Sequence, residues 1–311
     1  MSSVVCTLFE GDHHYGVGAL VNSLYAHGFR GTLCAGYRGP LPPWVVGAKR
    51  IGAITEFTPA EGLTLRFIPL ATQIHFAMYK PSFMLEVFER HFPQAESGFY
   101  FDPDITILCD WKFYEEWVEA GVAMCADVNA SMPASHPIRH AWKKTCVPRG
   151  IKFRRELDTY FNSGFFGLAR RNHDFLVLWE SLIKIIVESI GRTDTMHVGE
   201  RINKFAKTDQ DGFNIAAMAS EAPISAMGQD GMNFQQGGGG YVMSHAIGGV
   251  KPWNKNFLGS VVHYAKAPSR AEKDYFRHVQ HPIGLYRPIA KSFKQFSLKT
   301  ASLVARFMRT A

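Results

Sequence analysis

The stretch GFYFDPDITIL, residues 98–108, interrupts an apolar run with two carboxylates, Asp102 and Asp104, on either side of Pro103. Proline cannot donate a hydrogen bond to a neighbouring strand, so the pattern predicts a buried strand that ends at this point. Residues two apart on an extended chain point to the same side, so the two carboxylates could meet one ligand. The pair has three interpretations: ligands of Mg²⁺ or Mn²⁺, a site with a nucleophilic aspartate, or turn residues with solvated side chains.

Strands and helices alternate along the chain on both sides of this stretch. Apolar runs at residues 3–10 and 31–37 predict buried strands, and helical periodicity marks residues 173–191 and residues 81–92, where Pro81 would be the first helical residue. The alternation predicts an α/β domain with a mostly parallel central sheet flanked by helices. Ligands of such sheets bind beyond the carboxyl ends of the strands, which is where the two aspartates fall. The glycine-rich stretch 235–240 predicts a flexible loop.

The cysteines and the apolar segments favour a cytoplasmic protein. The five cysteines are odd in number and form no CxxC pair, which fits buried thiols in a reducing compartment better than disulfides. No apolar stretch approaches the roughly 20 residues that span a bilayer. The N-terminus lacks the basic region of a signal peptide.

Positive charge is concentrated at the C-terminus. Six of the basic residues and no acid lie from Arg287 onward, so the rest of the chain carries only +7 − 6 = +1. A nucleic-acid footprint over the body is therefore not expected. The apolar residues of this tail fall at helical spacing: Ile289, Phe293, Phe296, Leu303 and Phe307.

This tail belongs to a predicted C-terminal extension, residues 256–311, which follows a catalytic domain at residues 1–255. A basic amphipathic helix is typical of proteins that lie on an anionic membrane surface, which would make this protein peripheral on the inner face of a membrane. The alternative is a terminal helix that docks its phenylalanines on the domain.

Three later segments combine polar side chains with glycine. YFNSGFFGL, residues 160–168, puts Asn and Gly inside a strand, as a bulge or as a polar floor under a ligand. TDQDGFN, residues 208–214, opens a helix with acids that either cap it or face a ligand. SHAIGGVKPW, residues 244–253, offers a histidine and a lysine that are either structural or suited to a metal ion and the phosphates it carries.

Taken with DHHY at residues 12–15 and the DPD stretch, these segments resemble the family 8 glycosyltransferases, the retaining galactosyltransferase and glycogenin-like group. The order of the five motifs is preserved from the first strand to about Trp253. The resemblance implies a GT-A fold and a hexosyltransferase that retains anomeric configuration. Its donor would be a nucleotide-diphosphate sugar, with UDP as the first candidate, and its acceptor a glycan or lipid-linked saccharide.

The resemblance also implies a role for individual residues. It implies that Mn²⁺ or Mg²⁺ is bound by Asp102, Asp104 and His245. It implies catalytic groups beside the anomeric carbon at Asp209 and Gln210, and donor contacts at Thr7, Leu8, Asp12, Tyr15, Lys80, Asn162, Gly248 and Lys251. The chain departs from the family at His13 and His14, where relatives often carry Asp or Asn.

Two other functions remain open from the sequence. DPDIT also matches the D-x-D-x-[TV] pattern of haloacid-dehalogenase-like phosphatases, in which Asp102 would be the nucleophile. That chemistry needs a later G-D-x-x-x-D acidic motif, and the Gly-Asp pair of this chain, Gly11-Asp12, lies upstream instead. The other function is that of a non-catalytic domain that binds a sugar nucleotide.

Overall fold

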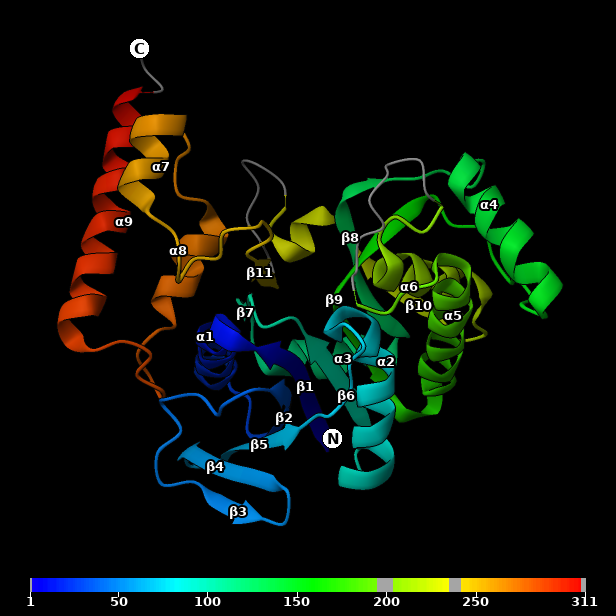
Figure 1. Ribbon diagram of the computed structural model, residues 1–311, viewed down its shortest axis with the longest axis horizontal. Coiled ribbons are helices and arrows are strands. Elements are labelled where there is room, and N and C mark those ends of the chain that lie inside the picture. Colours follow the sequence, from blue (N-terminus) through cyan, green and yellow to red (C-terminus); the bar gives the residue numbers. More distant parts are fainter. Residues whose placement is uncertain (1, 195–203, 235–241, 309–311) are drawn as a thin grey trace.

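The computed structural model describes residues 2–194, 204–234 and 242–308, and it shows an α/β architecture around one large sheet (Figure 1). The glycine-rich stretch 235–240 and the last basic residue, Arg309, lie outside the described residues. Within these described residues, the main sheet has nine strands. In spatial order they are β10 (Ile224–Met227), β8 (Val122–Ser131), β9 (Thr159–Ala169), β6 (Ser97–Phe101), β1 (Ser3–Glu10), β2 (Gly31–Arg38), β5 (Leu63–Pro69), β4 (Ile54–Ala60) and β3 (Lys49–Ile51).

The strands β6, β1, β2 and β5 run parallel to one another at the centre of this sheet. Antiparallel pairs flank them, because β9 pairs antiparallel with both β6 and β8, and β4 with both β5 and β3. Parallel strands need long crossover connections. The helix α1 (His14–Ala26) lies in the connection from β1 to β2, and α2 (Phe76–Glu86) lies in the connection from β5 to β6, whereas the connection from β2 to β5 carries the strands β3 and β4. The predicted α/β class with a central sheet between helices is confirmed.

Helices cover both faces of the sheet. They are α1 (His14–Ala26), α2 (Phe76–Glu86), α3 (Trp111–Glu119), α4 (Pro137–Cys146), α5 (Asp174–Ile190), α6 (Thr208–Ala219), α7 (Phe257–Tyr264), α8 (Arg270–Arg277) and α9 (Pro288–Met308). Figure 1 shows α7, α8 and α9, in orange and red, on one side of the molecule and α4, α5 and α6 on the opposite side.

Alternate residues of β1 divide the interior into two cores. Val5 and Phe9 face one core, which includes residues of α1, α3, α7, α8 and α9. Cys6 and Leu8 face the other core, which includes residues of α2, α4, α5 and α6. This is the period of two that an extended chain imposes on its side chains. The segment after residue 255 therefore packs on the same face of the sheet as α1.

The predicted strand of residues 98–108 is divided as expected. The strand β6 ends at Phe101, and the chain turns at Asp102–Asp104, where the amide of Ile105 donates to the carbonyl of Asp102 at 3.0 Å. The next strand, β7 (Ile105–Ile107), leaves the main sheet and pairs antiparallel with β11 (Met243–His245).

The predicted start of the helix at Pro81 is wrong. The helix α2 begins at Phe76, five residues earlier, and Pro81 lies inside it. Its first turn is capped by His75, whose Nδ1 accepts a hydrogen bond from the amide of Ala77 at 3.2 Å. This cap, which satisfies one of the amides that a helix start leaves unpaired, was not visible in the apolar periodicity.

Candidate active site

A cavity of about 720 Å³ opens at the carboxyl ends of the central strands. Its wall combines the end of β1, the turn after β6, the middle of β9, the start of α6 and the segment after β11. Eleven of the predicted site residues line it: Leu8, Asp12, Lys80, Asp102, Asp104, Asn162, Asp209, Gln210, His245, Gly248 and Lys251. The structure thus brings together residues that are up to 243 positions apart in the sequence (251 − 8 = 243).

Asp102, Asp104 and His245 form a compact cluster in this cavity. One ligand atom from each residue lies within 4.8 Å of the others. Nε2 of His245 is 3.2 Å from Oδ1 of Asp104 and 4.0 Å from Oδ2 of Asp102. The turn after β6 directs the two carboxylates to one place, and the pairing of His245 with Ile105 in the small sheet brings the imidazole to them.

Two lysines neutralise the carboxylates of this cluster. Nζ of Lys251 is 2.6 Å from Oδ2 of Asp104. Burial raises the pKa of Asp104, but His245 and Lys251 outweigh it and hold the pKa of this carboxyl well below its usual range. Nζ of Lys80 is 3.0 Å from Oδ1 of Asp102 and 3.5 Å from Oδ2 of Asp209. Burial lowers the pKa of Lys80, but these two carboxylates raise it above its ordinary value, so Lys80 stays charged.

Residues 162–164 form a polar floor under the cluster. The side-chain oxygen of Asn162 accepts from the amide of Gly164 at 2.8 Å, and the carbonyl of Gly164 accepts from the amide of Asp102 at 2.7 Å. A Cβ on Gly164 would lie 2.5 Å from Cε1 of His245 and 2.9 Å from Oδ2 of Asp102, closer than real contacts allow. Glycine is therefore needed at residue 164 for the strand to approach the cluster.

Asp209 and Gln210 reach the cavity from the first turn of α6. The hydroxyl of Ser163 donates to Oδ2 of Asp209 at 2.7 Å, and Oε1 of Gln210 accepts from the amide of Ser163 at 3.3 Å. Nε2 of Gln210 is buried without a hydrogen-bond partner among the described residues. The third polar residue of this segment, Asp211, faces away from the cavity and accepts from the hydroxyl of Tyr160 at 2.7 Å. Burial raises the pKa of Asp211 to about 7.

The sequence missed several residues of this wall, and Asp127 is the most informative of them. Oδ2 of Asp127 accepts from the amide nitrogen of Asn162 at 2.7 Å, and Oδ1 lies 3.5 Å from Nζ of Lys207. Burial raises the pKa of Asp127, but the hydrogen bond from Asn162 leads the contacts that bring it below its ordinary value. An acid that directly follows the apolar run VAMCA was a usable signal, since Asp102 follows its own strand in the same way.

Two predicted residues lie outside the described wall of the cavity. Thr7 is fully buried in β1, and its hydroxyl has no partner among the described residues. The ring of Tyr15 stacks on Tyr286, with centroids 5.2 Å apart and planes 12° from parallel. Between them in the sequence, Asp12 does line the cavity and accepts a hydrogen bond from Nδ2 of Asn254.

Comparison with known proteins identifies the fold. The structure is similar to the apo structure of WbbM, a bifunctional glycosyltransferase, with a TM-score of 0.55 and 13% identity, over 96% of this chain and 52% of WbbM. It is also similar to the glycosyltransferase GlyE of Streptococcus pneumoniae TIGR4, with a TM-score of 0.48 and 14% identity, over 96% of this chain and 64% of GlyE. This chain thus spans less than two thirds of either protein. No protein-family model and no curated protein sequence matches it. The likeness to WbbM confirms the predicted GT-A fold class.

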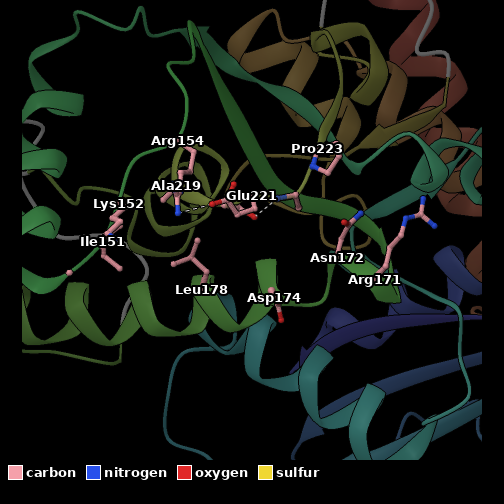
Figure 2. A pocket seen from close by; sticks show the side chains of 13 residues that line it. Ile151, Lys152, Arg154, Arg171, Asn172, Asp174, Leu178, Ala219, Glu221 and Pro223 are labelled. Carbon is pink, nitrogen blue, oxygen red and sulfur yellow. Dashed lines mark hydrogen bonds and ion pairs between the residues drawn. The ribbon is translucent and has the colours of Figure 1, made fainter.

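A second cavity, of about 480 Å³, lies beside the start of α5 and the end of α6 (Figure 2). Figure 2 shows Arg154 and Glu221 close together on its wall, and their Nη2 and Oε1 atoms are 2.6 Å apart. Among the described residues that line it, none belongs to the predicted site. Arg171 of this wall pairs with Glu119, which lies outside it, at 3.0 Å. Since the predicted site residues gather in the larger cavity, we place the chemistry there.

Proposed function

We propose that this protein is a metal-dependent, retaining glycosyltransferase of the family 8 type, which transfers a hexose from a UDP-sugar to a glycan or lipid-linked saccharide in the cytoplasm. One observation carries the proposal. A single cavity gathers two carboxylates and an imidazole suited to a divalent ion, two lysines suited to a diphosphate, and the polar pair Asp209 and Gln210. The GT-A fold shared with a glycosyltransferase supports it.

The cluster of Asp102, Asp104 and His245 fits a divalent metal ion. Carboxylate oxygens suit Mg²⁺ and Mn²⁺, and an added imidazole nitrogen favours Mn²⁺. The ligand atoms lie within 4.8 Å of one another, which allows all three to face one ion. When bound, the ion would neutralise the negative charge that develops on a departing diphosphate.

The remaining residues of the cavity would act on the donor directly. Lys251 lines the cavity and carries a cation that can bind phosphate oxygens. Asp209, held by Ser163 and Lys80, offers a fixed carboxylate oxygen to the positive charge that develops at the anomeric carbon. The side-chain amide of Gln210, whose nitrogen has no hydrogen-bond partner within 3.5 Å among the described residues, suits a sugar hydroxyl.

A binding screen followed by a matched pair of variants tests the proposal. Thermal unfolding with UDP, GDP and their sugars, with and without Mn²⁺, should show the largest stabilisation with a UDP-sugar and Mn²⁺ together. The variant Asp104→Asn should lose this stabilisation and at least about a hundredfold in transfer rate, because metal charge stabilisation is worth several kcal/mol. The control Asp174→Asn, at an aspartate that is 88% exposed and lies outside the larger cavity, should retain both.

Each alternative function has its own outcome in these assays. Near-normal transfer by Asp104→Asn would contradict the metal assignment. Phosphate release from simple phosphate esters, without regard to UDP, would indicate a phosphatase with Asp102 as nucleophile. Donor binding without transfer or hydrolysis would indicate a non-catalytic domain. Nuclear magnetic resonance of the first-formed product tests whether the anomeric configuration of the donor is retained. A first product of inverted configuration would exclude a retaining mechanism.

A further inference from the structure

The C-terminal helix α9 has two apolar faces on opposite sides. One face is buried against the body through Leu298, Ala301 and Ala305. The other face carries five large apolar side chains that are each between 53% and 87% exposed: Ile289, Phe293, Phe296, Leu303 and Phe307. These five follow one another at steps of three, four or seven residues, so they form a single stripe along a helix of 21 residues, which is about 32 Å long.

The docking of α9 does not use the exposed stripe. Nζ of Lys294 donates to the carbonyl of Trp253 at 2.7 Å and lies 5.5 Å from the centre of the Tyr286 ring. Together with the small buried residues, these contacts fix the helix on the body. Figure 1 shows α9 at the outer edge of the molecule, with α7 and α8 between it and the sheet. The stripe side chains of Ile289, Phe293, Phe296 and Leu303 thus lie in solvent, where large apolar groups in a row are costly unless a partner covers them.

The charges around the stripe select one kind of partner. Lys299 and Arg306 each follow a stripe residue by three positions, so they lie together on one flank of it. Arg287 adds an exposed cation just before the helix. No acid occurs anywhere after Asp274 in the sequence. A partner for this surface must be apolar where it meets the stripe and negatively charged beside it.

We propose that the stripe of α9 binds an anionic lipid bilayer, with its phenylalanines inserted among the acyl chains and Lys299 and Arg306 on the lipid phosphates. An apolar stripe with basic residues beside it is typical of helices that lie in the plane of a membrane surface. Among the described residues, no helix has the length and apolar character to span the bilayer, so the contact is superficial. A second copy of the chain fits poorly, since a symmetric contact would bring the cations of two α9 helices together without an acid between them.

Flotation of the full-length protein with vesicles tests this inference. The wild type should bind vesicles of phosphatidylcholine mixed with phosphatidylglycerol, and bind phosphatidylcholine alone much more weakly. The triple variant Phe293→Ser, Phe296→Ser, Leu303→Ser should lose at least about tenfold in partitioning, because three apolar side chains no longer leave water. Replacing Lys299 and Arg306 by Gln should weaken binding to the anionic vesicles by about fivefold for each charge.

A matched control distinguishes binding through the α9 stripe from non-specific binding through other exposed apolar side chains. The variant Val46→Ser, Ile51→Ser, Val147→Ser removes three apolar side chains that are 55–75% exposed elsewhere on the surface, and it should bind vesicles like the wild type. Both triple variants should keep the thermal midpoint and the donor binding of the wild type. If the α9 triple variant unfolds early, the single variants Phe293→Ser and Phe296→Ser replace it in the same assay.

Two results would overturn the inference. The first is wild-type binding to anionic vesicles that survives the α9 substitutions. The second is a wild-type protein that does not bind vesicles and sediments as a dimer, while the α9 triple variant sediments as a monomer. That second result would assign the stripe to a second copy of the chain.

Discussion

Lys80 tests the charge balance of the candidate site, and we expect Lys80→Met to destabilise the protein strongly. The side chain is 4% exposed, and its ammonium lies between Asp102 and Asp209 and donates to the carbonyl of Ser163 at 3.0 Å. Methionine keeps most of the length of the side chain and removes the charge, so the substitution leaves two carboxylates without their shared cation.

The size of the effect follows from the burial of the two acids. Removing one member of a buried ion pair costs about 3–5 kcal/mol, because the remaining charge is neither solvated nor paired. The side chain of Asp102 is 24% exposed and can gain some water, whereas that of Asp209 is 9% exposed and cannot. We therefore expect the low end, about 3 kcal/mol, which corresponds to roughly 5 °C in the thermal midpoint of a chain of this size.

The assay is thermal and urea unfolding of Lys80→Met in a buffer without divalent ions. The matched control is Lys112→Met, which breaks an exposed pair with Glu116 whose side chains are 78% and 66% exposed. Exposed pairs contribute less than about 1 kcal/mol, so the control should unfold like the wild type. Adding Mn²⁺ should stabilise Lys80→Met more than the wild type, because the ion returns positive charge to Asp102. Equal thermal midpoints for the Lys80 and Lys112 variants would refute the stabilising role of the ion pairs that Lys80 makes with Asp102 and Asp209.

Three further predictions concern neighbouring residues. Asp211, whose folded pKa of about 7 lies above the unfolded value of 3.8, contributes stability that is present below pH 4 and lost as the pH rises through 7. Thermal midpoints from pH 5 to 8 should therefore fall less for Asp211→Asn than for the wild type. Gly164→Ala would put a Cβ 2.5 Å from the histidine ring, so its metal-induced thermal shift should shrink and its transfer rate should fall about a hundredfold. Gly284→Ala, where the added Cβ has no contact closer than 3.7 Å, should match the wild type in both assays. Asp127→Ala removes the acceptor of the Asn162 amide, which should cost about 1–3 kcal/mol in urea unfolding, and an unchanged stability would contradict that hydrogen bond.

Local sequence patterns predicted much of the fold. The buried strand at residues 3–10 and the helix at residues 173–191 agree with β1 and with α5 to within one residue. These elements depend on periodicity and on end signals that neighbouring residues supply, such as Gly191 after α5. The start of α2 was mispredicted, because a histidine cap lies outside the apolar pattern and Pro81 resembled a helix start.

Some residues of the candidate site could be predicted from their neighbours in the sequence, whereas others depend on contacts between distant segments. The residues of DPD, NSG and DQD could be predicted from the sequence, because polar groups and glycine interrupt apolar segments there. Asp127 was missed, although it follows its strand as Asp102 does, since no resemblance singled it out. Its bond to Asn162 joins residues 35 positions apart, and such a distance is closed only by the pairing of β8 with β9.

By itself, the sequence determined where the strands end and which side chains could carry chemistry, because backbone preferences and side-chain types are local properties. Only the tertiary structure decided which of those side chains meet. The pairing of β7 with β11 brings His245 to Asp104, and the buried ammonium of Lys80 joins Asp102 to Asp209. Tertiary packing also decided that α9 docks through its small residues and leaves its phenylalanines in solvent. Burial and charge pairing depend on residues that are distant in the chain, and no window of sequence contains them.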